Sequence, residues 1–215
     1  MPSLQAAIDE YNAFKKETMP AEVLATMART TSELKDTGIE SRALRAGDRI
    51  PDFTLPNQHG EMRRFADFLV ESPVVLNIYR GGWCPYCNFE MKALAEALPE
   101  IEAAGAQLVG MAPEDPDHAL DTASRHDIGI EILSDAGNAV SEQLGLVFSL
   151  AEELRPIYLA AGLDIPAYNG DDSFRLPVPA TYIVGSDGIV KAHFVNADYT
   201  QRMEPAEIVA FLQQG

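Results

Sequence analysis

The sequence predicts an α/β fold in which a central mixed sheet is flanked by helices and is preceded by a separate helical segment. Apolar runs of strand length alternate with stretches of helical periodicity from residue 44 onward. An Asp-Gly pair at 187–188 separates two β-branched runs, which is the pattern of a β-hairpin. The first 43 residues show only helical periodicity. We therefore divide the chain into an N-terminal helical extension over 1–43 and a main domain over 44–215.

The N-terminal extension is predicted to form two helices, separated by Met19 and Pro20. The first helix carries apolar residues on one face, namely Leu4, Ile8, Tyr11 and Phe14. The second helix ends before Gly38 and turns a similar set inward, namely Val23, Leu24, Met27 and Leu34. We expect the extension to pack on the main domain or on a partner subunit, which allows a homodimer. Its acidic residues and lysines are expected to form a solvated face without chemistry.

The first half of the main domain is predicted to alternate between strands and helices. The expected elements are a hairpin over 52–65 with its turn at 57–60, a strand over 74–79, a helix that ends near Gly105, a strand over 106–111, a helix from about Asp117 to His126, and a strand over 130–133. Ser134 and Asp135 then predict the cap of a helix that runs to about Leu144. This alternation favours an open sheet with helices on its faces.

The second half of the main domain is predicted to end in a hairpin and a helix. The elements expected here are a helix from a capping box at Ser149 and Glu152 to about Ala160, a loop over 162–177, a hairpin over 180–194 and a helix over 205–212. Pro156 is expected to interrupt or kink the first of these helices. The loop over 162–177 is rich in Gly, Pro, Asp and Asn, and it is either a functional flap or an irregular connection.

The composition excludes several classes of function. The chain of 215 residues has a formal net charge of −17, which opposes nucleic-acid phosphates, so we expect no nucleic-acid partner. Its apolar runs are shorter than the roughly 20 residues of a membrane span, so we expect no membrane partner. The N-terminus lacks the basic and apolar regions of a secretory signal. With two cysteines and no export signal, we expect a cytoplasmic protein. In that reducing compartment a cysteine pair is more often catalytic than structural.

The clearest chemical signal lies where an apolar strand ends in two glycines and the two cysteines of the chain follow, Cys84 and Cys87. Pro85 between them suits the first turn of a helix. A helix N-terminus carries about half a positive charge, which stabilises a thiolate. Lowering a thiol pKa from about 8.5 to about 6.5 raises the thiolate fraction at neutral pH from roughly 3% to roughly 75%. Because two thiols one helical turn apart can form a local disulfide, the sequence predicts a redox-active pair.

Two other interpretations of the cysteine pair are weaker. A structural zinc site needs four ligands, but the chain has no other cysteine, and its four histidines show no paired ligand spacing: His59, His118, His126 and His193. Free cysteines are often inert and buried, but the glycine turn and the helix start disfavour that interpretation here. We expect neither a metal nor a cofactor.

The order of hairpin, strand, cysteine helix, strand, helix and Asp-Gly hairpin resembles the thioredoxin-fold superfamily. Within it, the chain is more similar to the alkyl hydroperoxide reductase/thiol-specific antioxidant family, the peroxiredoxin-like proteins. The resemblance covers residues 44–212, and its most specific segments are 47–55, 74–87, 133–135 and 180–184. It implies a thioredoxin-like fold and a thiol-dependent antioxidant enzyme.

The chain departs from the peroxiredoxin pattern in two places. Peroxiredoxins carry Pro-x-x-x-Thr-x-x-Cys at the peroxidatic cysteine, and this register puts Arg80 on the proline, Cys84 on the threonine and Cys87 on the peroxidatic cysteine. Peroxiredoxins also place an arginine just before the Ala-Thr-aromatic strand, where this chain has Pro179. Thioredoxins have a cis-proline at that position. We therefore expect a cis bond between Val178 and Pro179, beside the cysteine pair.

Two redox functions follow from this resemblance. In a peroxidase, Cys87 attacks a hydroperoxide and becomes a sulfenic acid, and Cys84 resolves it to an internal disulfide that a thioredoxin- or glutathione-type reductant reduces. In a thiol–disulfide reductase, Cys84 attacks a protein disulfide and Cys87 resolves the mixed disulfide. We prefer the peroxidase, because the flanking segments resemble peroxiredoxins throughout. A redox-inactive binding module that uses residues 162–177 is a third hypothesis, which the cysteines at a helix start disfavour.

Five further residues are candidates for supporting roles. Arg80 is either the cationic partner of the thiolate or a solvent-facing loop residue. Trp83 and Tyr86 either contact substrate or pack at the end of the strand. Pro85 and Tyr86 form a dipeptide that resembles glutaredoxins, whose redox potentials are less reducing than that of thioredoxin. Pro179 keeps a bulky basic group away from the thiols.

Overall fold

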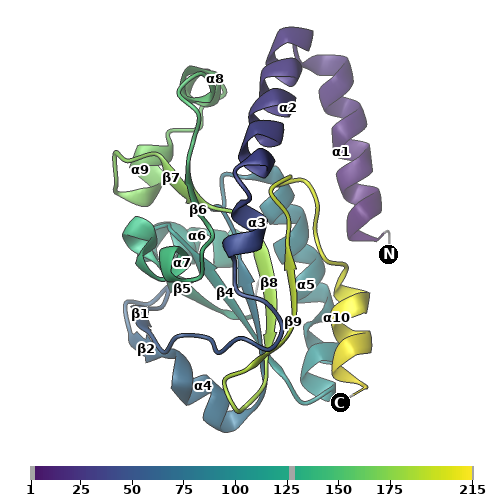
Figure 1. The fold of residues 1–215 in the computed structure, drawn as a ribbon, viewed down its shortest axis with the longest axis vertical. Coiled ribbons are helices and arrows are strands. Elements are labelled where there is room, and N and C mark those ends of the chain that lie inside the picture. Colours follow the sequence, from purple (N-terminus) through teal and green to yellow (C-terminus); the bar gives the residue numbers. More distant parts are fainter. Residues whose placement is uncertain (1–2, 126–128, 215) are drawn as a thin grey trace.

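A five-stranded mixed sheet lies at the centre of the protein (Figure 1). Its strands, in spatial order, are β5 (Glu131–Ser134), β4 (Gln107–Ala112), β3 (Val74–Ile78), β8 (Ala180–Val184) and β9 (Val190–Val195). β3, β4 and β5 are parallel, whereas β8 is antiparallel to both β3 and β9. The structure is a computed structural model that describes residues 3–125 and 129–214. The mixed sheet expected from the sequence is confirmed.

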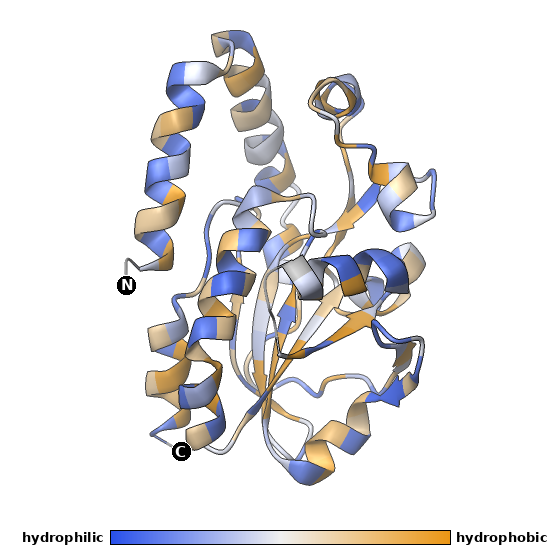
Figure 2. Ribbon diagram, turned by 180° about the vertical axis from the view of Figure 1, so that it is seen from behind, coloured by the Kyte–Doolittle hydropathy of each residue, from blue (hydrophilic) through white to orange (hydrophobic). Residues whose placement is uncertain are grey.

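Helices cover both faces of this sheet. On one face are α5 (Pro85–Ala103), α6 (Pro116–Arg125) and α10 (Pro205–Leu212); on the other are α4 (Phe65–Glu71) and α7 (Ala139–Gln143). Successive residues of a strand point to opposite faces, so Val75 lies in the first core and Leu76 in the second. Every residue of β3 and β8 is buried, as expected for strands covered on both faces. Figure 2 shows the central strands as predominantly hydrophobic.

The N-terminal extension forms the helices α1 (Leu4–Thr18), α2 (Ala21–Asp36) and α3 (Ile39–Arg42). α1 and α2 lie side by side as a helical hairpin and mix hydrophobic with hydrophilic residues along their lengths (Figures 1 and 2). The buried residues Leu4 and Ile8 pack α1 against α5. The Glu204 carboxylate accepts the N–H groups of Leu4 and Gln5, and it also caps the start of α10. One carboxylate therefore joins the extension to the C-terminal helix.

Two short antiparallel strand pairs lie outside the central sheet. They are β1 (Thr54–Pro56) with β2 (Met62–Arg64), and β6 (Val147–Ser149) with β7 (Arg175–Pro177). The first pair confirms the expected hairpin at 52–65. Two short helices separate β6 from β7, namely α8 (Leu154–Ala160) and α9 (Ile165–Asn169). The prediction of a long loop over 162–177 is therefore wrong, because this stretch contains α9 and β7.

The capping box expected at Ser149 and Glu152 is wrong. Ser149 is the last residue of β6, where it pairs with Arg175, and α8 begins only at Leu154 without a side-chain cap. Pro156 lies in the first turn of α8, where a missing N–H costs little, so it does not kink the helix. The pairing of β6 with a strand 26 residues later decides this segment, rather than the local cap signal.

The helix expected after Ser134 and Asp135 begins later than predicted. A 3₁₀ turn at Ala136–Asn138 precedes α7. The Asp135 carboxylate nevertheless acts as a cap, since it accepts the N–H groups of Val140 and Ser141 at 2.9 and 2.8 Å. The expected helix before it is α6, and the predicted end of that helix at His126 lies outside the described residues. No helix within the described ranges is long and apolar enough to cross a membrane.

Candidate active site

The two cysteines lie at the start of α5, immediately after β3 and a short loop. Cys84 is the N-cap residue of α5, Cys87 lies in its first turn, and both thiols are free. The loop needs its two glycines. Gly81 has a φ of +132°, and a Cβ there would clash with the Trp83 indole, while a Cβ at Gly82 would clash with Thr122. The strand, the glycine turn and the helix start expected from the sequence thus place both sulfurs at one end of the sheet.

Only one of the two thiols borders a cavity. Cys84 and Cys87 are both buried, with 1% and 0% of their surface exposed. Cys84, unlike Cys87, lines a cavity of about 120 Å³ together with Lys15, Tyr158 and Tyr199. A small molecule in this cavity would therefore meet the sulfur of Cys84 rather than that of Cys87.

Arg80 is a buried cation beside Cys84. It is only 2% exposed, so the interpretation of a solvent-facing residue is wrong. Its guanidinium lies 4.5 and 4.9 Å from the ring centroids of Tyr199 and Trp83, and Nη2 donates to the Tyr158 hydroxyl at 3.0 Å. Within residues 3–125 and 129–214, Arg80 forms no ion pair with a carboxylate, and its Nε has no hydrogen-bond partner. Cys84 is therefore a natural anion for this charge.

The electrostatics separate the pKa values of the two thiols. Burial raises the pKa of Cys84, but a hydrogen bond from Cys87 and the charges of Arg80 and Arg202 outweigh burial and lower it to about 5. Burial raises the pKa of Cys87 well above its ordinary value, and the hydrogen bond to Cys84 and the charge on Cys84 raise it further. The pair therefore holds a thiolate on Cys84 and a proton on Cys87.

A second buried arginine, Arg202, contacts the other cysteine. Its Nη2 lies 3.5 Å from Sγ of Cys87, and its Nε lies 2.7 Å from Oε2 of Glu90. Both side chains of this ion pair are 2% exposed. Glu90 lies three residues after Cys87 on the same helix, and an acidic residue on an inward helix face indicates a cationic partner. Sequence reasoning missed both residues, although Glu90 carried this signal.

The expectation for Pro179 is wrong. The described residues contain no cis peptide bond, so the bond between Val178 and Pro179 is trans. The chain runs on from β7 into β8, and the N–H of Val178 donates to the carbonyl of Leu146 at 2.9 Å, so no tight turn is needed here. Pro179 lines a cavity that contains Arg80 but neither cysteine. A cation does lie beside the cysteine pair, but it comes from Arg202, far along the chain, which contacts Cys87.

The N-terminal extension contributes side chains to the site. Lys15 on α1 lines the cavity of Cys84, and its Nζ lies 3.2 Å from the hydroxyl of Tyr86. That hydroxyl donates to Oδ1 of Asn12 at 2.5 Å. Tyr86 is 2% exposed and packs edge-on against Tyr11. The expectation that the lysines of the extension form only a solvated face is therefore wrong for Lys15.

The remaining candidates pack around the cysteines. Trp83 is 6% exposed and meets Tyr158 edge-to-face at 5.9 Å. Pro85 is the first residue of α5 and lines the same cavity as Trp83 and Cys84. These contacts support a packing role for Trp83 and Tyr86 while leaving both at the cavity wall. Within the described ranges, no cluster of three or more His, Cys, Asp or Glu residues is arranged to hold a metal ion.

Glu114 holds the turn that precedes Cys84. Its Oε1 accepts the N–H of Gly82 at 2.7 Å, and its Oε2 lies 3.5 Å from the hydroxyl of Thr122. Burial raises the pKa of Glu114 to about 7, and the hydrogen bond from Gly82 opposes this shift. Sequence reasoning missed this contact, because Glu114 lies beyond the next strand.

The model of the AhpC/TSA family matches residues 46–193, more than half of the chain. The chain belongs to this family. Peroxiredoxin Bcp of Escherichia coli is 30% identical over 103 residues, which cover 48% of this chain and 65% of that relative. The chloroplastic peroxiredoxin Q of Triticum aestivum is 28% identical over 134 residues, covering 62% of this chain and 61% of that relative. The alignments thus span just under two thirds of these AhpC/TSA relatives.

Solved structures show the same fold. Peroxidoxin BcpB from Mycobacterium tuberculosis has a TM-score of 0.61 at 22% identity, covering 80% of this chain and 97% of that one. Reduced Prx3 from Vibrio vulnificus, solved in complex with H₂O₂, has a TM-score of 0.63 at 18% identity, covering 79% of this chain and 99% of that one. The resemblance to the AhpC/TSA family and the thioredoxin-like fold are therefore confirmed.

Proposed function

We propose that this AhpC/TSA protein is a thiol peroxidase that reduces small hydroperoxides through Cys84 and Cys87. The observation that carries this proposal is the thiol of Cys84 on the wall of a small cavity, beside the buried guanidinium of Arg80. A buried cation without a carboxylate favours the thiolate form of Cys84, and the thiolate is the nucleophile. We assign the attack to Cys84, whereas the peroxiredoxin register assigns it to Cys87.

The proposed reaction balances with the residues of this site. The Cys84 thiolate attacks the terminal oxygen of a hydroperoxide, the O–O bond breaks, and the products are a sulfenic acid on Cys84 and an alkoxide or hydroxide. The leaving oxygen takes a proton and departs as an alcohol or water. The Cys87 thiol then attacks the Cys84 sulfur, which releases water and forms the internal disulfide. An external thioredoxin- or glutathione-type reductant supplies two electrons and two protons to restore both thiols.

We assign the proton for the leaving oxygen to Lys15. Its ammonium lines the cavity of Cys84 and is held by the hydroxyl of Tyr86. Burial lowers the pKa of Lys15 below its ordinary value, although the negative charge of Cys84 opposes this shift. A lowered pKa makes the ammonium a better proton donor, and solvent restores the proton after each turnover.

The covering of Cys84 favours a small peroxide over a protein disulfide. Side chains from α1, α2 and the turn between them line the cavity of this sulfur, namely Tyr11, Lys15, Met19 and Met27. A thiol–disulfide reductase would need these helices to move before a protein disulfide could reach Cys84. The pair at a helix start keeps that activity as the second candidate. A redox-inactive module that uses residues 162–177 is disfavoured, because Leu163 in this stretch lines the cavity of Cys84.

Two further assignments are proposals that rest on this chemistry. We place the protein in the cytoplasm, where a reducing thiol pool would return the disulfide to its dithiol form. We also retain a homodimer as an arrangement to test by light scattering. Neither assignment is required for the reaction at Cys84.

The nucleophile is tested with single serine variants. Cys87→Ser should still form a sulfenic acid with one equivalent of hydrogen peroxide, and a sulfenic-acid trap should label it at Cys84. Cys84→Ser should lose rapid peroxide consumption and should not be labelled. If the trap labels only Cys84→Ser, then Cys87 is the nucleophile and the peroxiredoxin register holds. If neither variant nor the unaltered protein consumes peroxide while insulin disulfides are reduced, the protein is a disulfide reductase.

A further inference from the structure

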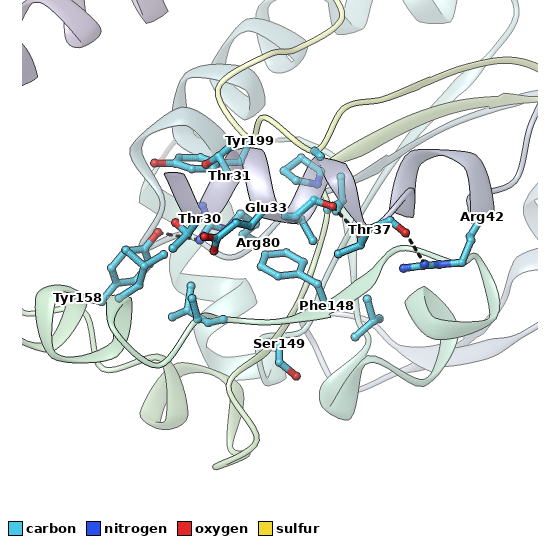
Figure 3. A pocket seen from close by; sticks show the side chains of 18 residues that line it. Thr30, Thr31, Glu33, Thr37, Arg42, Arg80, Phe148, Ser149, Tyr158 and Tyr199 are labelled. Carbon is cyan, nitrogen blue, oxygen red and sulfur yellow. Dashed lines mark hydrogen bonds between the residues drawn. The ribbon is translucent and has the colours of Figure 1, made fainter. Parts of the chain in front are cut away.

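A second cavity, of about 310 Å³, adjoins the site. It shares Arg80, Tyr158 and Tyr199 with the cavity of Cys84, but neither cysteine lines it. Its walls come from α2, β6, the start of α8 and the residues just before β8. Figure 3 shows Arg80 within this cavity, joined to Tyr158 by a hydrogen bond, with Phe148 on the wall. The guanidinium of Arg80 thus contributes to both cavities.

Most of the wall of this second cavity is apolar. The apolar side chains include Leu34, Val147, Phe148, Leu150, Leu154 and Val178. Two of its threonines, Thr30 and Thr31, donate their hydroxyls to carbonyls of their own helix, so these donors are already used. Glu33 is paired with Arg29. Arg42 also lines the cavity, but it is exposed and donates to the carbonyl of Thr37. The guanidinium of Arg80 is therefore the buried charge that a ligand in this cavity would meet.

Arg80 retains unused hydrogen-bonding capacity. A guanidinium has five N–H donors, and in the described part of the chain Arg80 donates one hydrogen bond, to Tyr158. Arg202, the other buried arginine of the site, is instead paired with Glu90 and donates to the carbonyls of Tyr199 and Gln201. A buried charge that lacks a carboxylate is costly, so an anionic ligand would stabilise it.

We propose that the second cavity binds an organic carboxylate with an apolar body. The carboxylate would accept hydrogen bonds from Arg80. A planar guanidinium can donate two parallel hydrogen bonds to a carboxylate, which the compact ammonium of a lysine cannot do. Tyr158, whose hydroxyl accepts from Arg80, and Tyr199 line the same cavity. The apolar body would lie against α2, β6 and α8. A cavity of 310 Å³ has room for about ten water volumes, which fits a medium-length alkyl chain or one aromatic ring.

This carboxylate would be coupled to the redox state of the cysteines. It would share the charge of Arg80 with the Cys84 thiolate, so each anion weakens the stabilisation of the other. Ligand binding should therefore raise the pKa of Cys84. Since such coupling is reciprocal, oxidation of the pair to a disulfide removes the competing thiolate and should tighten ligand binding. The binding site itself does not depend on the proposed peroxidase activity, whereas this coupling rests on the thiolate assigned to Cys84.

Octanoate is a suitable probe, with 1-octanol and acetate as controls for its two halves. Trp83 is the single tryptophan of the chain and lies 4.9 Å from the guanidinium of Arg80, so its fluorescence should report binding. We expect saturable binding of octanoate to the reduced protein, with octanol and acetate each about tenfold weaker or more. The oxidised protein should bind octanoate about tenfold more tightly. Saturating octanoate should also raise the midpoint of the thiolate absorbance titration.

A cavity-filling variant locates the binding. Ala151→Phe places a ring in the second cavity, whereas Ala160→Phe places the same ring at an exposed position at the end of α8. Ala151→Phe should abolish octanoate binding and leave the ligand-free thiolate titration unchanged, and Ala160→Phe should change neither. Absence of saturable binding, equal binding of octanol and octanoate, or full binding to Ala151→Phe would each overturn the proposal. These readouts need no peroxide, so a failure of the peroxidase assignment is distinguishable from a failure of the site.

Discussion

The two buried arginines of the site differ in their anionic partner. Arg202 lies beside Cys87 and is paired with Glu90 at 2.7 Å, so most of its charge is already compensated. Arg80 lies beside Cys84 and has no carboxylate partner among the described residues. The pKa of Cys84 is lowered, and that of Cys87 is raised. Burial and the hydrogen bond between the two thiols dominate this separation, and both arginines lower the pKa of Cys84. The comparison teaches that Cys84 gains from two nearby cations, one of them without a carboxylate in the described ranges, whereas burial outweighs the single compensated cation beside Cys87.

The largest expected effect comes from breaking the compensated pair. Glu90→Gln leaves Arg202 buried without its carboxylate, which should destabilise the folded protein by about 3–5 kcal/mol in urea unfolding. The freed charge of Arg202 should also lower the pKa of Cys87 and so reduce the difference between the two thiols. Thiol alkylation rates measured against pH would report this second effect.

Two controls accompany Glu90→Gln. Glu96→Gln changes an exposed glutamate of the same helix and should have little effect. The double variant Glu90→Leu with Arg202→Met removes both charges and should recover much of the lost stability, because no uncompensated charge remains. A double variant as unstable as Glu90→Gln would show that shape, and not charge, holds this pair together.

Glu114 is the acidic counterpart of Arg80, since it is a buried carboxylate without an arginine partner in the part of the chain that the structure describes. Its closest hydrogen-bond donor is the backbone N–H of Gly82. Burial raises the pKa of Glu114 to about 7 from 4.5. Protonation of Glu114 therefore stabilises the fold fully below about pH 4.5, and this contribution is lost as the pH rises through about 7. This contribution is roughly 3 kcal/mol, from about 1.36 kcal/mol per pKa unit.

Glu114→Gln tests this contribution. The glutamine resembles the protonated carboxyl and can still accept the N–H of Gly82. Unfolding free energy measured between pH 4.5 and 8 should fall less with rising pH for the variant than for the unaltered protein. Parallel pH profiles for the two proteins would show that Glu114 is ionised throughout this range.

Arg80→Met tests the uncompensated cation. Without Arg80, burial should dominate at Cys84 and raise its pKa from about 5 toward or above the ordinary thiol value. If the pKa reaches about 8.5, the thiolate fraction at neutral pH falls to roughly 3%, an about 30-fold loss from this cause alone. Thiolate absorbance and peroxide consumption should fall together, and Arg80→Lys should restore part of both. An unchanged titration midpoint in Arg80→Met would leave the hydrogen bond from Cys87 and the charge of Arg202 as the source of the lowered pKa.

Local patterns predicted most of the fold and the position of both cysteines. The strand, glycine turn and helix around Cys84 follow from spacing within a few residues, and the structure confirms them. Ser149 shows where local signals fail, because a cap pattern there is overridden by strand pairing with residues that follow much later. Burial of Arg80 was also beyond a local pattern, since three aromatic rings from separate segments enclose it.

The partners of the cysteines were harder to predict than the cysteines themselves. Arg202 contacts Cys87 across 115 residues of sequence, and Lys15 contacts Tyr86 across 71. Neither residue lies in a motif, and each reaches the site because a whole helix or loop packs on α5. The sequence predicts an N-terminal extension without chemistry, because only its apolar stripe is visible there. The packing of the extension on α5 places Lys15 at the cavity, whereas the adjacent Lys16 is exposed to solvent.

This pair of lysines provides the last test, which asks whether Lys15 donates a proton to the leaving oxygen or only stabilises the thiolate. Lys15→Met should slow peroxide reduction about tenfold. This loss is smaller than the usual contribution of a general acid, because the ammonium is half-exposed and water can also donate the proton. Lys16→Met should leave the rate unchanged. The loss in Lys15→Met should be larger for an alkyl hydroperoxide whose alcohol is less acidic, since a poorer leaving group depends more on proton donation. If Lys15 only stabilised the thiolate of Cys84, both hydroperoxides would slow equally and the midpoint of the thiolate titration would rise. Stopped-flow rates for two hydroperoxides, combined with that titration, distinguish a proton donor from a second supporting charge.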